Sequence, residues 1–406
     1  MSLASRLPFR HPYAAGFPGL GSQPVPTDAD ALDYLDRMAA ADGAGVEVGV
    51  ATAVDAFVAD SKALGVWDSI RASCVLAGAR TLAGALVPLR DYGPELVDIN
   101  SLESPSINNL GGSAGYWDAA SRTAYSTATG AAGYPYFVFP VSVVVGKTYR
   151  FSGVLSGDFA DINLFRFGNL NVTIAEDGSF DASLVANFAD FKIYFESSLG
   201  PQAVTIDSLS IREVIAAPTN VADGFVEGDF SRTAGLTGDG TSYIDSGRAN
   251  DDDPQDDVHN SVYVSSAVGT GSVYGLIGTS GQSAPNGETV IGIDDRSSAD
   301  TVFFRATNNT AALNVAGKGH TTGLYGVARQ DAAGFNARVD STAYSLVQAS
   351  ATPASINAFV FARNNNGTAS NISNGTLAFY SIGTSLSLED LDTAVTNLIT
   401  AIGEAL

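Results

Sequence analysis

The sequence predicts a mostly β protein in which two antiparallel β-sandwiches follow a small N-terminal helical unit. The chain has 406 residues, which exceeds one typical core and indicates several domains. Apolar residues recur at three- and four-residue steps over 27–90, whereas they alternate with polar residues in segments of 95–383. Charged residues make up only 16% and glycine numbers 43, which is typical of short strands joined by tight turns.

The first 26 residues are predicted to form an extended anchoring arm. They contain five prolines interleaved with Phe9, Tyr13 and Phe17, and proline excludes a helix or a central strand. We expect this apolar arm to pack onto another surface, such as a neighbouring subunit; the alternative is an unattached terminus. Arginine, proline and glycine interrupt its apolar residues, so we expect no signal peptide, and no apolar run suggests a membrane span.

Residues 27–94 are predicted to form a helical base of two or three helices. Thr27 or Asp28 can cap the first helix, and glycines at 65 and 78 can end the next two segments. Cys74 falls in the third segment, is the single cysteine of the chain and is expected to be a small core residue. The expected buried stripes are Leu32, Leu35 and Met38; Val46, Val50, Val54, Phe57 and Val58; and Trp67, Ile70, Cys74 and Val75.

Residues 95–215 are predicted to form the first sandwich. The segments "KTYRFSGVL" and "DFKIYFES" alternate apolar and polar residues, and turn signals such as "EDGS" separate the strands. Roughly seven to nine short strands in this length is typical of an antiparallel sandwich. A linker, "IAAPTN", leads to 216–406, where the alternation resumes before a final amphipathic helix capped by Ser387.

The stretch "FARNNNGTASNISNGTLAFYSIG" (361–383) interrupts this alternation with an almost uncharged tract. Its flanks, "INAFVFAR" and "TLAFYSIG", are typical of strands. Asparagine and glycine readily adopt positive φ angles, so the tract is predicted to form a long hairpin between the two strands.

Three stretches carry a resemblance to a known group of proteins. "GDGTSYIDSG" (238–247), the stretch 361–383 and the terminal "SLSLEDLDTAVTNL" resemble the C-terminal domain of many tailed-phage virion proteins, a concanavalin A-like (laminin-G-like) lectin jelly roll. In such proteins it often follows a helical segment similar to "AFVADSKALGVWDSIRASCVLAGA". "VTIDSLSIREV" is similar to the last strand of carbohydrate-binding-module-like sandwiches. The implied domains are an arm (1–26), a helical base (27–94), a carbohydrate-binding-module-like sandwich (95–215) and a concanavalin A-like jelly roll with its C-terminal helix (216–406).

The resemblance implies a structural virion protein of a tailed phage or a phage-like particle such as a gene transfer agent. It would be a head spike, a head fibre or a tail fibre, assembled in the bacterial host cytoplasm, that attaches the particle to host cell-surface polysaccharide. The arm and helices would contact other virion proteins, and such components are homo-oligomers as a rule. Two alternatives stay open: a capsid decoration or cement protein without glycan binding, and a polysaccharide depolymerase.

Composition and motifs argue against two classes of function, nucleic-acid binding and glucanase-type catalysis. A net charge of -22 repels phosphate backbones, so nucleic acid is not expected as a partner. The glucanase branch of the lectin-like superfamily needs closely spaced carboxylates on one strand, as in E-x-D-x-x-E. In "ETVIGIDDRSSAD", Glu288 and Asp294 lie six residues apart and do not reproduce that spacing. We therefore expect no enzyme and no cofactor apart from a candidate Ca²⁺ site.

Two sets of residues are candidate ligand sites. Aromatic rings in loop-like contexts can bind sugar faces, although aromatic residues of a sandwich often belong to its core. The run "NDDDPQDDVHN" (250–260) offers the oxygen ligands that suit Ca²⁺, and its alternative is a solvated loop. The glycan candidates are Tyr116, Trp117, Tyr134 and Tyr136, and the Ca²⁺ candidates are Asp251, Asp253 and Asp256.

Overall fold

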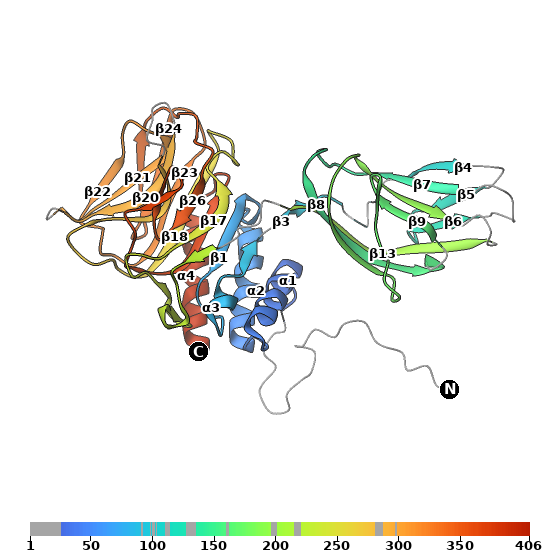
Figure 1. Cartoon of the computed structure of the whole chain (residues 1–406), viewed down its shortest axis with the longest axis horizontal. Helices are drawn as coiled ribbons and strands as arrows, with labels where there is room; N and C mark the ends of the chain where they lie inside the picture. The colour runs from blue at the N-terminus through green and yellow to red at the C-terminus, as the bar shows by residue number, and fades with distance from the viewer. Residues whose placement is uncertain are drawn as a thin grey trace. The chain divides into compact units, whose positions relative to one another are not determined.

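The computed structural model describes most of the chain as two compact units (Figure 1). The described residues are 26–406 without 91, 98, 100–101, 103, 110–113, 127–134, 160–161, 196–200, 215–220, 281–286 and 297–298. One unit comprises Tyr92–Ile215, and the other joins Met1–Asp91 to Ala216–Leu406. The arm predicted over 1–26 lies outside the described residues except for Pro26. Among the described residues, no helix has both the length and the apolar character needed to cross a membrane.

The unit Tyr92–Ile215 is an antiparallel β-sandwich, as the alternation predicts. One sheet has the order β10-β9-β12-β7-β4, and the other has the order β11-β8-β13-β6-β5 with β3 on β13. Between them lies an aromatic core that includes Phe137, Phe151 and Phe191, all without solvent exposure. The strands are β3 (Tyr92–Glu95), β4 (Ser106–Asn109), β5 (Gly115–Asp118), β6 (Thr123–Ser126), β7 (Pro135–Pro140), β8 (Thr148–Gly157), β9 (Ile162–Phe167), β10 (Leu170–Asn171), β11 (Ser179–Val185), β12 (Asp190–Phe195) and β13 (Gln202–Val214).

The other unit is a jelly-roll sandwich of two nine-stranded sheets. Sheet 1 has the order β15-β16-β29-β18-β23-β24-β25, with β1 on β29 and β2 on β1. Sheet 2 has the order β14-β17-β26-β19-β20-β21-β22, with the β27–β28 hairpin on β19. Sheet 1 contains β1 (Ile70–Val75), β2 (Pro88–Arg90), β15 (Phe230–Ser231), β16 (Gly235–Thr237), β18 (Val258–Ser266), β23 (Gly323–Arg329), β24 (Gly334–Val339), β25 (Thr342–Val347) and β29 (Thr376–Gly383). Sheet 2 contains β14 (Val221–Asp223), β17 (Tyr243–Ala249), β19 (Val273–Ser280), β20 (Glu288–Asp294), β21 (Thr301–Asn308), β22 (Leu313–Ala316), β26 (Asn357–Val360), β27 (Arg363–Asn365) and β28 (Thr368–Ser370).

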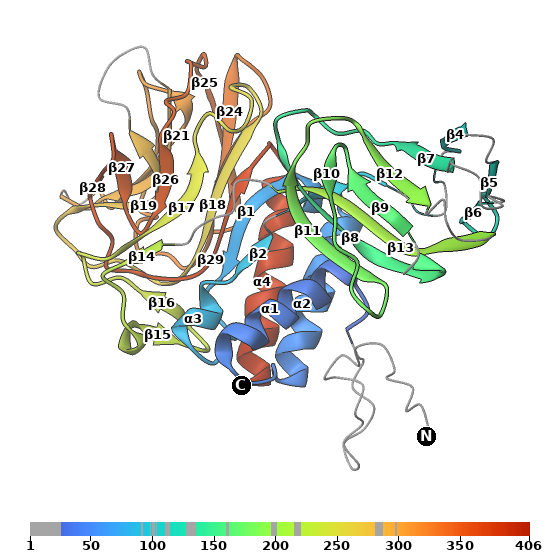
Figure 2. The same cartoon turned by 45° about the vertical axis from the view of Figure 1, so that its right-hand side comes forward.

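Helices cover the face of sheet 1 that points away from sheet 2 (Figure 2). Phe57 and Leu398 from two helices share one buried cluster with Leu324 and Phe379 from sheet 1. The caps are those that the sequence predicts: Asp28 accepts hydrogen bonds at the first helix, and Ser387 does so at the last. The helices are α1 (Ala29–Asp42), α2 (Val48–Ala63), the short α3 (Leu82–Ala85) and α4 (Leu388–Ala405), with 3-10 turns at Trp67–Ser69 and Glu227–Asp229. The predicted helical base therefore shares its core with the jelly roll.

The third segment of the predicted helical base, which contains Cys74, is a strand and not a helix. After the 3-10 turn, β1 pairs with β29 in the register Ser73↔Ser381 and Cys74↔Tyr380. Both faces of β1 are buried: Val75 belongs to the helix-side cluster, whereas Cys74 belongs to the core between the sheets. A short apolar run buried on both sides has no periodicity that separates strand from helix. Burial also raises the pKa of the Cys74 thiol, in keeping with the expected core role.

The hairpin predicted at 361–383 is correct in its turn but wrong in its strands. β27 and β28 form a short hairpin in which Asn366 and Gly367 adopt φ angles of 49° and 89°. The flanking strands β26 and β29 lie in different sheets and do not pair. The Asn/Gly tract therefore crosses from one sheet to the other and carries the small hairpin on the way.

We predict that protonation of His259 destabilises this unit. His259 is fully buried in β18; its Nδ1–H donates to the Thr384 carbonyl at 2.6 Å, and its Nε2 accepts from the Ser381 hydroxyl at 2.9 Å. Burial lowers its pKa from 6.5 to about 4, so the unfolded chain binds this proton first as the pH falls. The contribution of neutral His259 to the free energy of unfolding is fully present above about pH 6.5. It decreases as the pH falls towards 4, by about 3 kcal/mol in total.

The measurement is urea unfolding of the wild type and of His259→Gln between pH 7 and pH 4. The carboxylates contribute equally to the pH dependence of both proteins. The difference between the two plots of unfolding free energy against pH therefore isolates the contribution of His259. The wild type should lose more stability than the variant over this interval. Parallel profiles would contradict the prediction.

Candidate functional site

A cavity of about 680 Å³ lies on the face of sheet 2 that points away from sheet 1. Its residues come from four neighbouring strands, β19 to β22, and from the segment around the β27–β28 hairpin. Polar and charged side chains predominate. The lining residues are Val273, Asp294, Arg296, Thr301, Phe303, Arg305, Ala312, Asn314, Arg363 and Asn371.

The pleat of β21 builds the floor of the cavity. Phe303 and Arg305 line the cavity, whereas their neighbours Val302 and Phe304 are buried between the sheets. Gly292 on β20 lies directly opposite Phe303, and a Cβ at Gly292 would be only 2.3 Å from the ring. The glycine therefore lets the Phe303 ring lie against the sheet, where it offers a flat apolar surface.

The segment around the β27–β28 hairpin forms one wall. The Gly275 amide on β19 donates to the Asn371 carbonyl at 2.5 Å. A Cβ at Gly275 would be only 2.7 Å from the backbone nitrogen of Arg363. This close packing brings Arg363 and Asn371 to the cavity. The stretch 361–383 thus supplies site residues that the sequence analysis did not assign, although its conspicuous composition was a signal that could have found them.

Three arginines meet at this cavity in a chain whose net charge is -22. Arg296 donates to both oxygens of Asp294, at 2.9 and 2.7 Å, and this bonding holds the Asp294 pKa below its usual range. Arg305 pairs with Glu288, which also accepts from Ser280.

Arg363 is the least neutralised of the three arginines. Among the described carboxylates, none lies within ion-pair distance of Arg363. The Nε atoms of both Arg305 and Arg363 are buried without a hydrogen-bond partner in the described chain. A buried donor left unpaired is unfavourable. Both side chains also line the cavity, so their guanidinium groups are suited to an acceptor that enters it.

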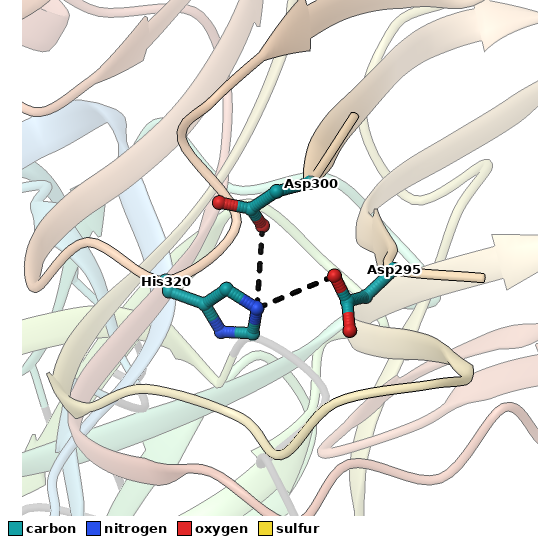
Figure 3. A group of neighbouring side chains, drawn as sticks. All are labelled: Asp295, Asp300 and His320. Atoms are coloured by element: carbon teal, nitrogen blue, oxygen red, sulfur yellow. Dashed lines mark ion pairs between the residues drawn. The ribbon is translucent and has the colours of Figure 1, made fainter. Parts of the chain in front are cut away.

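A separate cluster lies where β20 ends and β21 begins (Figure 3). His320 Nε2 is 3.3 Å from an Asp295 oxygen and 3.5 Å from an Asp300 oxygen. Asp295 follows β20, Asp300 precedes β21, and His320 lies in the loop after β22. One potential ligand atom from each of these three residues lies within 4.8 Å of the other two. Among the described residues, no other group of three histidine, cysteine or acidic side chains is as compact.

The predicted aromatic platform is divided between two sheets of the other unit. Tyr116 is 52% exposed and stacks on Tyr125 with a centroid distance of 4.4 Å. Its neighbour Trp117 points the other way and packs edge-on against the buried Phe139. Tyr136 stands on β7 in the opposite sheet, and Tyr134 lies outside the described residues.

Tyr136 nevertheless has features of a binding surface. Its ring stacks on Tyr194 at 4.8 Å, and the Arg166 guanidinium lies over Tyr194 at 5.4 Å. Tyr116 is thus an exposed aromatic surface and Tyr136 a separate, half-buried one, and their binding of glycan stays a prediction.

The acidic run is organised by a buried ion pair. Asp253 accepts two hydrogen bonds from Arg248, at 3.0 and 2.6 Å, and both side chains are 6% exposed. Asp251 is exposed, and one Asp256 oxygen is buried without a hydrogen-bond partner in the described chain. These three residues do not form a compact ligand group. Ca²⁺ binding at the run stays a prediction, with Asp253 already engaged.

Comparison with known proteins finds no matching family model. No curated protein matches the sequence either.

Solved structures similar to parts of this chain include lectin-like domains. The CBM40 of the Ruminococcus gnavus IT-sialidase is 11% identical, covers 35% of this chain and 83% of its own, and has a TM-score of 0.28. The K499G mutant of NanB sialidase from Streptococcus pneumoniae is 16% identical, with 39% and 27% covered and a TM-score of 0.30. Domains LG4-5 of the mouse laminin α1 chain are 10% identical, with 63% and 88% covered and a TM-score of 0.27. At these values the similarity carries no argument about function.

We predict that Asp253 stabilises the fold irrespective of Ca²⁺. Asp253→Asn should lower the free energy of unfolding by about 3 kcal/mol, because Arg248 would stay buried without its counter-charge. The exposed Asp251→Asn control should change it by less than about 0.5 kcal/mol. Urea unfolding with Ca²⁺ and with EDTA measures both. An Asp253→Asn variant as stable as the wild type, or a loss of stability in this variant that appears only with Ca²⁺, would contradict the structural role.

Proposed function

We propose that the protein is a non-enzymatic structural virion protein that attaches a tailed phage or phage-like particle to cell-surface polysaccharide. We further propose that the cavity on sheet 2 binds the glycan. The observation that supports glycan binding most is the combination of an aromatic floor with guanidinium and amide groups in one cavity.

The lining groups match the surface of a sugar. The Phe303 ring can stack on the apolar C–H face of a pyranose, while Asn314, Asn371 and Asp294 can bond its hydroxyls. The cavity volume of about 680 Å³ is within the range of sites that hold small ligands. Glycan binding therefore needs no rearrangement of the strands.

The charge of the lining favours an acidic polysaccharide. Three arginines meet at the cavity and two of them are paired, with Asp294 and Glu288, which leaves the charge of Arg363 in excess; guanidinium groups bind carboxylates through paired hydrogen bonds. The protein as a whole repels anions, so such a ligand would be recognised at short range by these side chains. We infer that sugars bearing carboxylates bind better than neutral ones.

The virion setting rests on the resemblance of the stretches 238–247, 361–383 and 385–398 to tailed-phage proteins. In this proposal the arm and helices contact other virion proteins in a homo-oligomeric spike or fibre, at the head or the tail. The protein assembles in the bacterial host cytoplasm and then remains in the virion. If the protein binds no glycan, a role as a capsid decoration or cement protein would be favoured instead.

The depolymerase alternative is less well supported by the local chemistry. Its carboxylic acid would need a raised pKa in order to protonate the glycosidic oxygen. The bonds from Arg296 instead lower the pKa of Asp294, and Glu288 is bonded to Arg305 and Ser280. We therefore expect polysaccharide to be bound without release of reducing sugars, and Asp294→Asn to leave that result unchanged.

We predict that Arg363→Gln weakens binding of acidic polysaccharide by about tenfold or more, because it removes a charged side chain that has no ion-pair partner among the described residues. Binding of neutral polysaccharide should change less. A glycan array that includes host capsule, followed by calorimetric titration of the glycans that bind, measures both effects. The control is Arg150→Gln, which removes a half-buried arginine of the other unit that is paired with Asp181.

Equal affinity of Arg363→Gln and wild type for acidic glycans would refute the assignment of the cavity. Absence of binding to every glycan would refute the attachment function and favour the cement alternative.

A further inference from the structure

We propose that Asp295, Asp300 and His320 bind one divalent transition-metal ion of the Zn²⁺ class. The site lies at the end of the β20–β21 hairpin, beside the cavity, and was not among the residues predicted from the sequence (Figure 3). The proposal does not depend on glycan binding.

The distances between the side chains fit metal ligands better than hydrogen bonds. His320 Nε2 is 3.3 Å from an Asp295 oxygen and 3.5 Å from an Asp300 oxygen. Both distances exceed the usual N–H···O range of about 2.7–3.2 Å. Two ligands at about 2.0–2.1 Å from a tetrahedral ion are separated by about 3.3 Å. One ion could therefore bind all three side chains with little movement.

Bonds around Asp295 orient its free oxygen. Oδ2 accepts from the Gly271 amide at 2.7 Å, and the Asp295 amide donates to the Ser272 carbonyl at 2.9 Å. The side chain is only 11% exposed. Hydrogen bonds to the second oxygen of a metal-binding carboxylate fix its orientation. Here the bond to Oδ2 leaves Oδ1 free to point towards His320.

Asp300 presents to His320 an oxygen that accepts no hydrogen bond from the described residues. Its Oδ1, the atom nearest His320, is buried and has no hydrogen-bond partner in the described chain. Gly319 lies so close that a Cβ there would be 2.1 Å from this oxygen. The Asp300 carbonyl accepts from the Lys318 and Gly319 amides, which holds the His320 loop beside the carboxylate.

The donor set defines the class of ion. One imidazole and two carboxylates suit Zn²⁺ and its transition-metal neighbours, whereas Ca²⁺ and Mg²⁺ prefer oxygen ligands alone. Three protein ligands leave the fourth position to water. The same three side chains could otherwise form only an ion pair between a protonated imidazole and two carboxylates, which is the outcome against which the site is tested.

The experiment uses the full chain, freed of metal with EDTA and dialysed. Calorimetric titration with ZnCl₂ should give one site per chain, and Co²⁺ should give the visible absorption of a tetrahedral complex. His320→Gln and Asp300→Asn should each weaken Zn²⁺ binding by more than about tenfold. Asp251→Asn, from the acidic run, is the matched control and should bind as the wild type does.

Thermal unfolding distinguishes a lost site from a lost fold. Without metal, His320→Gln should unfold at the wild-type temperature; Zn²⁺ should raise that temperature for the wild type and the control but not for the variant. Absence of stoichiometric binding to the wild type, or Zn²⁺ binding that survives in His320→Gln, would overturn the proposal. Glycan titration of the metal-free protein tests the proposed function separately.

Discussion

The strand β29 is the element on which the rest of the larger unit depends. All eight of its residues are buried. It pairs with β18 along one edge, and with β16 and β1 along the other. Phe379 packs against the helices, whereas Tyr380 packs between the sheets. Because one strand supplies both cores, the helices α1, α2 and α4 and the sandwich form a single cooperative unit rather than a domain with an appended base.

This arrangement separates the helices from the proposed site. The helices occupy the outer face of sheet 1, whereas the cavity of about 680 Å³ lies on the outer face of sheet 2. On β21 the same pleat that buries Val302 and Phe304 presents Phe303 and Arg305 to the cavity. The positions of the binding groups therefore follow from the packing of the core behind them, which makes the site rigid at its floor. Sequence changes should be tolerated more easily in the wall. There Arg363 is positioned by backbone contacts of the β27–β28 hairpin and not by core packing.

Local signals in the sequence were sufficient for many of the elements but not for β1, for the pairing of β26 and β29, or for the site. Alternation predicted β8 and β12, and capping residues predicted where α1 and α4 begin, because these features depend on neighbours in the chain. The strand β1 was missed because its partner, β29, lies some 300 residues away. The cavity unites residues from Val273 to Asn371, so it exists only after the sheet has formed. For Trp117 the signal was local: next to Tyr116 on a strand, it had to face the opposite side.

The end of the β20–β21 hairpin connects the two proposed sites. Asp294 and Thr301 line the cavity, and the residues next to them, Asp295 and Asp300, belong to the cluster with His320. An ion held by that cluster would join the two strand ends to the loop after β22. It would thereby restrict the backbone from which Asp294 and Arg296 reach the cavity. Since ordering such groups opposes binding, a metal would favour glycan binding without touching the sugar. The two sites would then be linked through the stiffness of one hairpin, and each ligand would strengthen the binding of the other to the same degree.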